Sequence, residues 1–220
     1  MRKLSLGGVA FVVAVGFSIW AFPHLPERVP THWNIHGQVD GWSSPLAAAA
    51  ILPGVMLLLG MLFSVIPRID PRRESYQLHG GTYWTLVNAV LGFMAAVHVM
   101  VLGKAVGWNL DVAQVVAVAV GALFVLMGNL MTRIRPNWFI GIRTPWTLSS
   151  DTVWRKTHRM GGVTFVLAGL VLMLAGVVGN GSMRILGIAC IIVASLVPVV
   201  YSWFIWKKEQ EAPISGRPGA

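Results

Sequence analysis

Six uncharged, apolar runs constrain this chain more than any other feature of its sequence. They cover residues 4–22, 46–66, 82–102, 112–131, 162–179 and 185–206, and none of them contains Asp, Glu, Lys or Arg. A helix needs about 20 apolar residues to cross the hydrocarbon core of a bilayer, whereas a membrane barrel strand alternates over about 10 residues. The runs therefore predict an all-α, polytopic membrane protein with six transmembrane helices, the first of them an uncleaved helix.

The composition excludes other classes of protein. Hydrophobic residues make up 55% of the 220 residues and charged residues only 11%, whereas soluble domains carry roughly 25% charged residues. A soluble globular chain and a disordered chain are both excluded. The single cysteine, Cys190, lies in the last apolar run, so no intrachain disulfide can form.

The positive charges are distributed unequally between the two sides of the membrane. Fourteen of the 17 Lys and Arg residues lie in segments that share a side with the N-terminus. The other side carries three cations and three acids: Arg28, Lys104, Arg184, Glu27, Asp40 and Asp111. Because Lys and Arg concentrate in cytoplasmic segments, both termini are predicted to be cytoplasmic. The net charge of +9 then reflects membrane topology, and no direct contact with nucleic acid is predicted.

The first outer loop, residues 23–45, reads PHLPERVPTHWNIHGQVDGWSSP. Its four prolines and its Asp-Gly turn signal predict a stiff loop of extended and turn conformations, as a recognition surface requires. Its two tryptophans suit either the membrane interface or a partner. The side chains of His24, His32, His36 and Asp40 could bind Zn²⁺ or Cu²⁺. Because no H-E-x-x-H or paired cysteines support a metal site, the alternative is that they stabilise turns, and no cofactor is predicted.

The second inner loop, residues 132–161, is longer than an ordinary connection, which indicates a function. Ser149 or Ser150 can cap a short amphipathic helix that Gly161–Gly162 ends or hinges into the fifth span. On that helix an aromatic face contains Trp154, and a basic face contains arginines at i and i+4. The basic face predicts contact with anionic lipid, and the restricted backbone of the loop adds a docking site for a cytoplasmic protein.

No catalytic constellation is present. The sequence lacks G-x-S-x-G, Walker and H-E-x-x-H motifs, and the apolar runs hold no acidic or basic residues for an ion pathway. His98 is better explained by a hydrogen bond between helices than by proton transfer. We therefore predict a protein that is not an enzyme, without catalytic residues.

Two stretches resemble a known family. PTHWNIHGQVDGW (residues 30–42) resembles the extracytoplasmic loop of the DUF1648 domain, and NWFIGIRTPWTLSSDTVWRKTHRMGG (residues 137–162) is similar to the signature of the SdpI family of sporulation-delaying-protein immunity proteins. The resemblance implies a six-helix, multi-pass protein of the bacterial inner membrane. It also implies protection against a secreted, membrane-active peptide toxin, and recruitment of a cytoplasmic winged-helix repressor.

The expected organisation follows from these motifs. Residues 1–66 form a DUF1648-like helical hairpin that includes the outer loop 23–45, and residues 67–111 form a linker loop and the third helix. Residues 112–206 form an SdpI-like domain that includes the inner loop 132–161, and residues 207–220 form a polar C-terminal tail. The alternative functions are a small transporter or efflux component for a hydrophobic compound, and a metal-dependent membrane enzyme.

The candidate binding residues fall into two sets. Those expected to contact the toxin or another extracytoplasmic partner are His32, Trp33, Asn34, His36, Gly37, Asp40 and Trp42. Those expected to contact the regulator or lipid at the cytoplasmic face are Asn137, Trp138, Gly141, Arg143, Thr144, Pro145, Trp146, Trp154, Arg155, His158 and Arg159.

Overall fold

The computed structural model describes residues 5–211, and within this range six helices are long and apolar enough to cross a membrane. The long helices are α1 (Ser5–Ala21), α2 (Pro45–Ile69), α3 (Ser75–Ala105), α4 (Val112–Met131), α6 (Asp151–Val178) and α7 (Gly181–Glu211). The short elements are the 3₁₀ turn η2 (Phe22–His24), the strands β1 (Val29–Trp33) and β2 (Val39–Ser43), and helix α5 (Pro145–Ser149). The predicted all-α, multi-pass membrane fold is confirmed.

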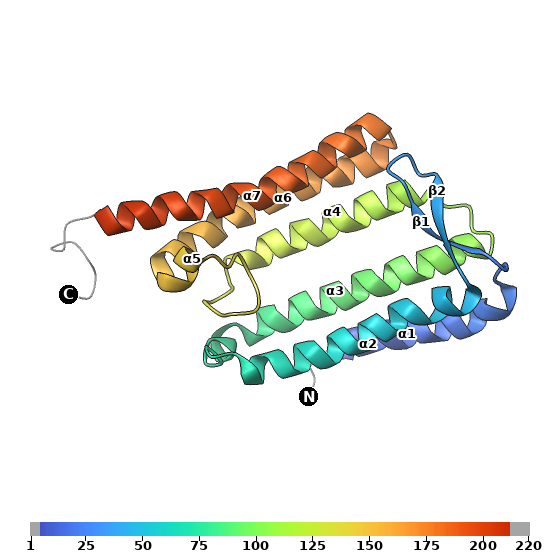
Figure 1. Ribbon diagram of the computed structural model, residues 1–220, viewed down its shortest axis with the longest axis horizontal. Coiled ribbons are helices and arrows are strands. Elements are labelled where there is room, and N and C mark those ends of the chain that lie inside the picture. Colours follow the sequence, from blue (N-terminus) through green and yellow to red (C-terminus); the bar gives the residue numbers. More distant parts are fainter. Residues whose placement is uncertain (1–4, 212–220) are drawn as a thin grey trace.

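The connections gather at two opposite ends of the helices (Figure 1). One end, here called the hairpin end, holds the β1–β2 hairpin, the α3–α4 loop and the α6–α7 turn. The other end, the α5 end, holds the α2–α3 connection, the loop between α4 and α5, and α5 itself. The three cations assigned to the outer side belong to the hairpin end. Of the cations assigned to the inner side, Arg2, Lys3 and Arg217 lie outside the described residues.

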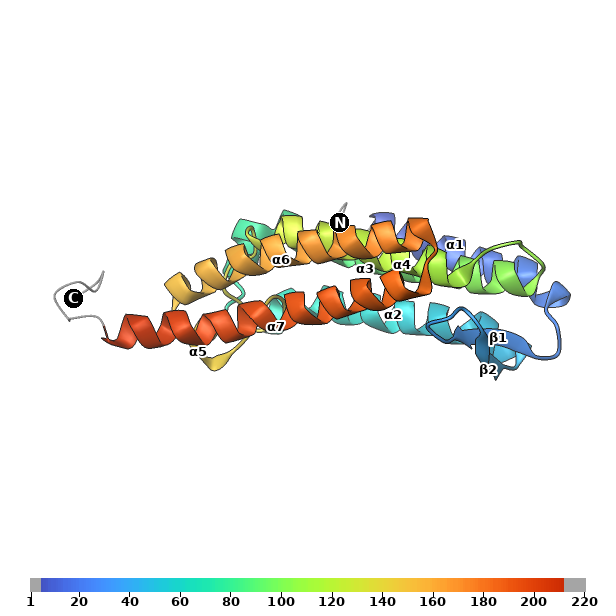
Figure 2. The ribbon, with the colours of Figure 1, turned by 90° about the horizontal axis from the view of Figure 1, so that it is seen from above.

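The long helices pack in two groups. Helices α1, α2 and α3 contact one another, and α6 packs against both α4 and α7. The contact between α3 and α4 joins the groups. Seen from above, α2 and α7 lie on the same side of the layer that contains α3, α4 and α6 (Figure 2). Because α3 contacts both groups, the division of the chain into two domains around it stays a prediction.

Glycines bring the backbones of α4 and α6 into direct contact. Gly162, Gly169 and Gly176 recur every seven residues and therefore share one face of α6. A Cβ on Gly169 would lie 2.6 Å from the carbonyl oxygen of Gly121, and a Cβ on Gly128 would lie 2.7 Å from that of Gly162. Small residues allow this approach between membrane helices, where packing rather than hydrophobic burial drives association.

His98 joins three helices by hydrogen bonds. The histidine is buried in α3, and its Nε2 lies 2.7 Å from Oγ of Ser18 in α1. The same hydroxyl lies 2.8 Å from the carbonyl oxygen of Ala49 in α2. The predicted role of His98 as a hydrogen-bonding residue between helices is confirmed.

The structure differs from the expectations at three places. The amphipathic helix is not a separate short helix: of the two alternatives, it continues through Gly161–Gly162 into the fifth span as α6. The outer loop contains two strands in addition to turns. Helix α7 continues to Glu211, so the first part of the predicted polar tail is helical, and residues 212–220 lie outside the described residues.

Candidate functional sites at the two membrane faces

The outer loop folds as a β-hairpin whose turn is stabilised by Asn34. Strands β1 and β2 pair antiparallel, with Val29 opposite Ser43 at the open end. The Oδ1 atom of Asn34 accepts hydrogen bonds from the backbone N–H groups of His36 at 2.9 Å and Gln38 at 3.0 Å. In a turn, backbone N–H groups do not all pair with the opposite strand, and side-chain acceptors such as this one bind them instead. The predicted recognition loop is therefore held by specific contacts.

His32 pairs with Asp40 across the hairpin. The Nδ1 atom of His32 lies 2.5 Å from Oδ1 of Asp40. The strand opposite has Gly41, where a Cβ would come within 2.8 Å of the Cβ of His32, so glycine leaves room for the imidazole. The ring of His24 instead donates its Nδ1–H to the carbonyl oxygen of Trp20 at 3.0 Å. Within residues 5–211, no three His, Cys, Asp or Glu side chains converge as a metal site would require.

The predicted outer contact residues divide by exposure. His32, His36, Asp40 and Trp42 are exposed. Trp33, Asn34 and Gly37 are half-buried and support the hairpin. The indole of Trp42 is 49% exposed, and the guanidinium of Arg28 lies 5.3 Å from its ring centroid. The hairpin thus presents aromatic and charged side chains on a fixed backbone at one face of the membrane.

At the α5 end, Asn137 closes the loop between α4 and α5. Its side chain is fully buried, and Oδ1 accepts from the N–H groups of Phe139 at 2.9 Å and Ile140 at 2.8 Å. Its Nδ2 donates to the carbonyl oxygens of Arg135 at 2.9 Å and Ile140 at 3.1 Å. One amide side chain therefore satisfies four backbone groups, which fixes the path of the loop.

Asp70 connects this loop to the first group of helices. The carboxylate is 2% exposed, and Oδ1 accepts from the backbone N–H of Arg72 at 2.7 Å. Its Oδ2 accepts from the hydroxyl of Tyr76 at 2.9 Å and from the backbone N–H of Trp138 at 3.1 Å. Hydrogen bonds to a buried charged group are the stronger kind, so Asp70 holds the α2–α3 connection against the α4–α5 loop.

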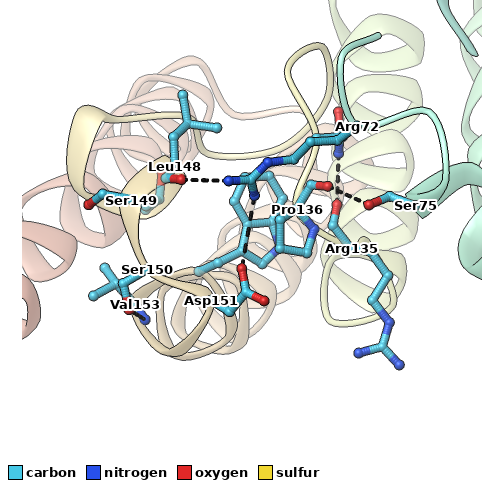
Figure 3. A network of polar contacts seen from close by, with 12 residues as sticks. Arg72, Ser75, Arg135, Pro136, Leu148, Ser149, Ser150, Asp151 and Val153 are labelled. Atoms are coloured by element: carbon cyan, nitrogen blue, oxygen red, sulfur yellow. Dashed lines mark hydrogen bonds and ion pairs between the residues drawn. The ribbon is translucent and has the colours of Figure 1, made fainter. Parts of the chain in front are cut away.

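Arg72 and Ser75 extend the connection, as Figure 3 shows. The guanidinium of Arg72 donates to the carbonyl oxygen of Leu148 at 2.9 Å and lies 3.9 Å from Oδ1 of Asp151 at the start of α6. Ser75 donates its hydroxyl to the carbonyl oxygen of Pro136 at 2.7 Å. Segments far apart in the sequence therefore form one structured surface at this end.

Trp154 and His158 form the base of this surface. Their rings stack with centroids 4.0 Å apart, as the i and i+4 spacing predicts. Nδ1–H of His158 donates to the carbonyl oxygen of Trp154 at 2.8 Å, and its Nε2 accepts from the N–H of Ile142 at 3.1 Å. These partners require the neutral Nδ1–H tautomer. Gly141 has φ +102°, and a Cβ there would collide with the ring of His158.

Helix α5 is held by a cap at its N-terminus and by a contact with α7. Thr144 and Thr147 form a reciprocal capping box, with Pro145 in the first turn where its missing N–H is not needed. Trp146 donates its indole N–H to the hydroxyl of Ser202 in α7. The start of α6 is capped by Ser150, which accepts from the N–H of Val153 at 3.3 Å, so the predicted serine cap is confirmed.

The predicted inner contact residues have two different positions. Asn137, Thr144, Trp154 and His158 are buried, and Gly141 lies against His158, so these residues position the loop. Those exposed to a partner or lipid are Trp138, Arg143, Pro145, Arg155 and Arg159, with Trp146 half-buried. Arg143 also donates to the carbonyl oxygen of Trp138 at 2.6 Å.

A groove of about 1220 Å³ lies between α6 and α7 at the α5 end. The cations Lys156, Arg159 and Lys208 line it together with the acid Glu209. Its apolar wall includes Phe204. A groove with an apolar wall and excess positive charge suits an acidic, amphipathic partner segment or anionic lipid.

Sequence reasoning missed several residues of these sites. Asp70, Arg72, Ser75 and Tyr76 lie just after the second apolar run, where polar residues indicate a solvated loop. The only feature of the sequence that could have indicated this site is Asp70, an acid at the end of an apolar run. Arg184 at the hairpin end was counted only as an outer charge, yet it is 7% exposed.

The chain is similar to known proteins along most of its length. Residues 133–202 match the SdpI/YfhL protein family, and residues 9–57 match the domain of unknown function DUF1648. The Immunity protein SdpI of Bacillus subtilis (strain 168) is 25% identical over 208 residues, which cover 94% of this chain and 98% of that protein. No solved structure matches the chain. The two matched regions contain the hairpin and the structured loop of the α5 end, so the predicted resemblance to the SdpI family and to the DUF1648 domain is confirmed at both places.

Proposed function

We propose that this multi-pass membrane protein is an immunity protein of a bacterial cytoplasmic membrane. In this proposal it protects the cell against a secreted, membrane-active peptide toxin. The observation that carries the proposal is the similarity to Immunity protein SdpI over 94% of this chain and 98% of that protein. Because the match extends over both ends of the helices, it includes each surface that the function would use.

The hairpin is the proposed contact surface for the toxin. It is assigned to the extracytoplasmic side because 14 of the 17 Lys and Arg residues belong to the opposite side. An amphipathic peptide offers both apolar and charged groups. The exposed indole of Trp42 and the pair formed by His32 and Asp40 can contact groups of both kinds.

The α5 end is the proposed contact surface for a cytoplasmic regulator. Arg155 and Arg159 lie exposed on α6, and Arg159 lines the groove between α6 and α7. The planar guanidinium binds carboxylates in a bidentate geometry, which supports recognition of an acidic surface. The regulator class that the family resemblance implies is a small winged-helix repressor, held at the membrane while toxin is present.

Protection is tested by exposing a strain without this gene to cell-free supernatant of the producing strain. The parent protein should restore growth, and Trp42→Ala should reduce protection because it removes the exposed aromatic group of the hairpin. Trp203→Ala is the matched control, since that indole is also partly exposed, at 38%, but lies at the other end. Full protection by Trp42→Ala at equal membrane levels would show that Trp42 is not part of the contact surface for the toxin. Absence of protection by the parent protein would refute the immunity function.

Recruitment is tested with charge-preserving and charge-removing variants of α6. If the arginines dock a protein, Arg155→Lys with Arg159→Lys should weaken co-purification of a cytoplasmic regulator from toxin-exposed cells, although the charge is kept. Arg155→Gln with Arg159→Gln should abolish co-purification of the regulator. Arg133→Gln is the matched control, because Arg133 is an exposed cation just after α4, and it should leave co-purification unchanged. Equal recovery with all variants would leave this face as a lipid-contacting surface. Each arginine would then contribute about 1 kcal/mol of attraction to anionic lipid.

A further inference from the structure

A cavity of about 560 Å³ lies beneath the hairpin. Strand β1 and the turn that follows it form the mouth, and α3, α4, α6 and α7 form the walls. Val101 of α3, Val116 and Val120 of α4 and Ile188 of α7 give the walls an apolar surface. The volume lies within the range of about 300–1,000 Å³ that is usual for small-molecule sites.

Arg184 lines this cavity and has an incomplete set of partners. The residue is 7% exposed, and its guanidinium donates to the carbonyl oxygen of Gly179 at 3.1 Å. A second nitrogen lies 3.5 Å from the carbonyl oxygen of Ile35, a long contact, and the buried Nε–H has no partner in the described structure. No acidic side chain of residues 5–211 forms an ion pair with Arg184. A buried cation without a counter-charge is unfavourable, so this site favours an anion.

The cavity extends along α4 from the hairpin end toward the middle of the helix. Its lining on α4 starts at Val112, at the hairpin end, and continues to Val120. Eight residue steps of helix correspond to about 12 Å along the helix axis. The polar lining residues Thr31, His32 and Asn34 come from the hairpin at the mouth. A ligand therefore needs an anionic head near Arg184 and an apolar body below it.

We propose that this cavity binds an anionic lipid-type amphiphile from the leaflet at the hairpin end. Its phosphate or carboxylate pairs with Arg184, and its acyl chain lies against the valines of α3 and α4. An acyl chain has no hydrogen-bonding groups. A peptide in the same place would bury N–H and C=O groups against apolar walls without partners. This inference does not depend on immunity, because it rests on the cavity and on Arg184.

The test uses the full chain in nanodiscs and probes with a diazirine on the acyl chain. Photoreactive phosphatidylglycerol supplies a phosphate head, a photoreactive fatty acid supplies a carboxylate, and photoreactive phosphatidylethanolamine is the zwitterionic comparison. Adducts are mapped by mass spectrometry. The variants are Arg184→Gln, Arg184→Lys and Val116→Phe, which fills the cavity but keeps the cation. Lys104→Gln is the matched control, since it removes a cation of the same face that does not line the cavity.

We expect an anionic probe to label the α3 and α4 walls of the parent and of Lys104→Gln. Labelling should fall about tenfold or more in Arg184→Gln, which loses the charge-assisted hydrogen bonds, and less in Arg184→Lys. Val116→Phe should also lose labelling, and this outcome remains decisive if Arg184→Gln fails to fold. Labelling by phosphatidylglycerol alone identifies a phospholipid, and labelling by the fatty acid alone identifies a free carboxylate. Equal labelling by phosphatidylethanolamine, or unchanged labelling in Arg184→Gln and Val116→Phe, would overturn the proposal.

Discussion

Replacing Asp70 by Asn tests whether this buried carboxylate holds the loops of the α5 end together. The change keeps the size of the side chain but leaves one oxygen instead of two. If the amide oxygen faces Tyr76 and Trp138, the amide NH₂ faces the N–H of Arg72, which is 2.7 Å away in the parent. If the side chain is turned over, the NH₂ faces the N–H of Trp138, 3.1 Å away. In either orientation one backbone donor loses its acceptor.

The expected cost is that of a buried donor without a partner, about 1–3 kcal/mol. The cost acts locally: the lost bond lies within the α2–α3 connection if Arg72 loses its acceptor, and joins that connection to the α4–α5 loop if Trp138 loses it. Amide hydrogen exchange should therefore accelerate about 5- to 150-fold, the equivalent of that free energy, in residues 70–76 or in residues 132–144. Exchange in the hairpin, at the other end of the molecule, should not change.

Hydrogen exchange measured by mass spectrometry on the protein in nanodiscs provides the readout. The matched control is Glu74→Gln, an exposed acid in the same connection whose side chain makes no capping hydrogen bond. The reasoning would be refuted by unchanged exchange of both the α2–α3 connection and the α4–α5 loop in Asp70→Asn. Equal acceleration in Glu74→Gln would show that charge, rather than the specific acceptor, is responsible.

Three other predictions concern packing, the turn and metal. Gly169→Val should lower the thermal stability of the detergent-solubilised protein, because its Cβ position is 2.6 Å from a carbonyl oxygen of α4, whereas Gly54→Val, with nothing within 4 Å, should not. Asn34→Ala should speed hydrogen exchange at the turn, since two exposed backbone donors lose their side-chain acceptor, at about 0.5–1.5 kcal/mol for each bond; unchanged exchange would contradict its role. Elemental analysis of the purified parent should find no stoichiometric zinc, and zinc that is lost in His32→Ala, His36→Ala would show that these side chains do bind metal.

The number of long helices and their approximate positions along the chain could be predicted from the sequence because bilayer thickness imposes a length on each apolar run. The ends of the helices could not. Helix α3 begins at Ser75, seven residues before the apolar run, because polar residues at the membrane boundary can remain helical. The strands β1 and β2 have five residues each, too few for a pattern to be distinguished from a proline-rich loop.

The candidate sites were predictable only in part. The Trp154–His158 contact follows from helical spacing, whereas the burial of Asp70 depends on Trp138, a residue 68 positions away. A charge beside an apolar run normally indicates a solvated position, and Asp70 and Arg184 were both assigned in this way. Their environment depends on how separate helices pack, which one sequence does not specify.

The sidedness of the two surfaces tests the central claim most directly. In a Cys190→Ser background, which removes the single native cysteine, Gln38→Cys places a thiol on the exposed hairpin turn and Ser149→Cys places one on exposed α5. A membrane-impermeant maleimide should label Gln38→Cys in intact cells, and should label Ser149→Cys only after the membrane is permeabilised. Labelling of Ser149→Cys in intact cells, with Gln38→Cys protected, would place the hairpin in the cytoplasm and contradict the proposed roles of both surfaces.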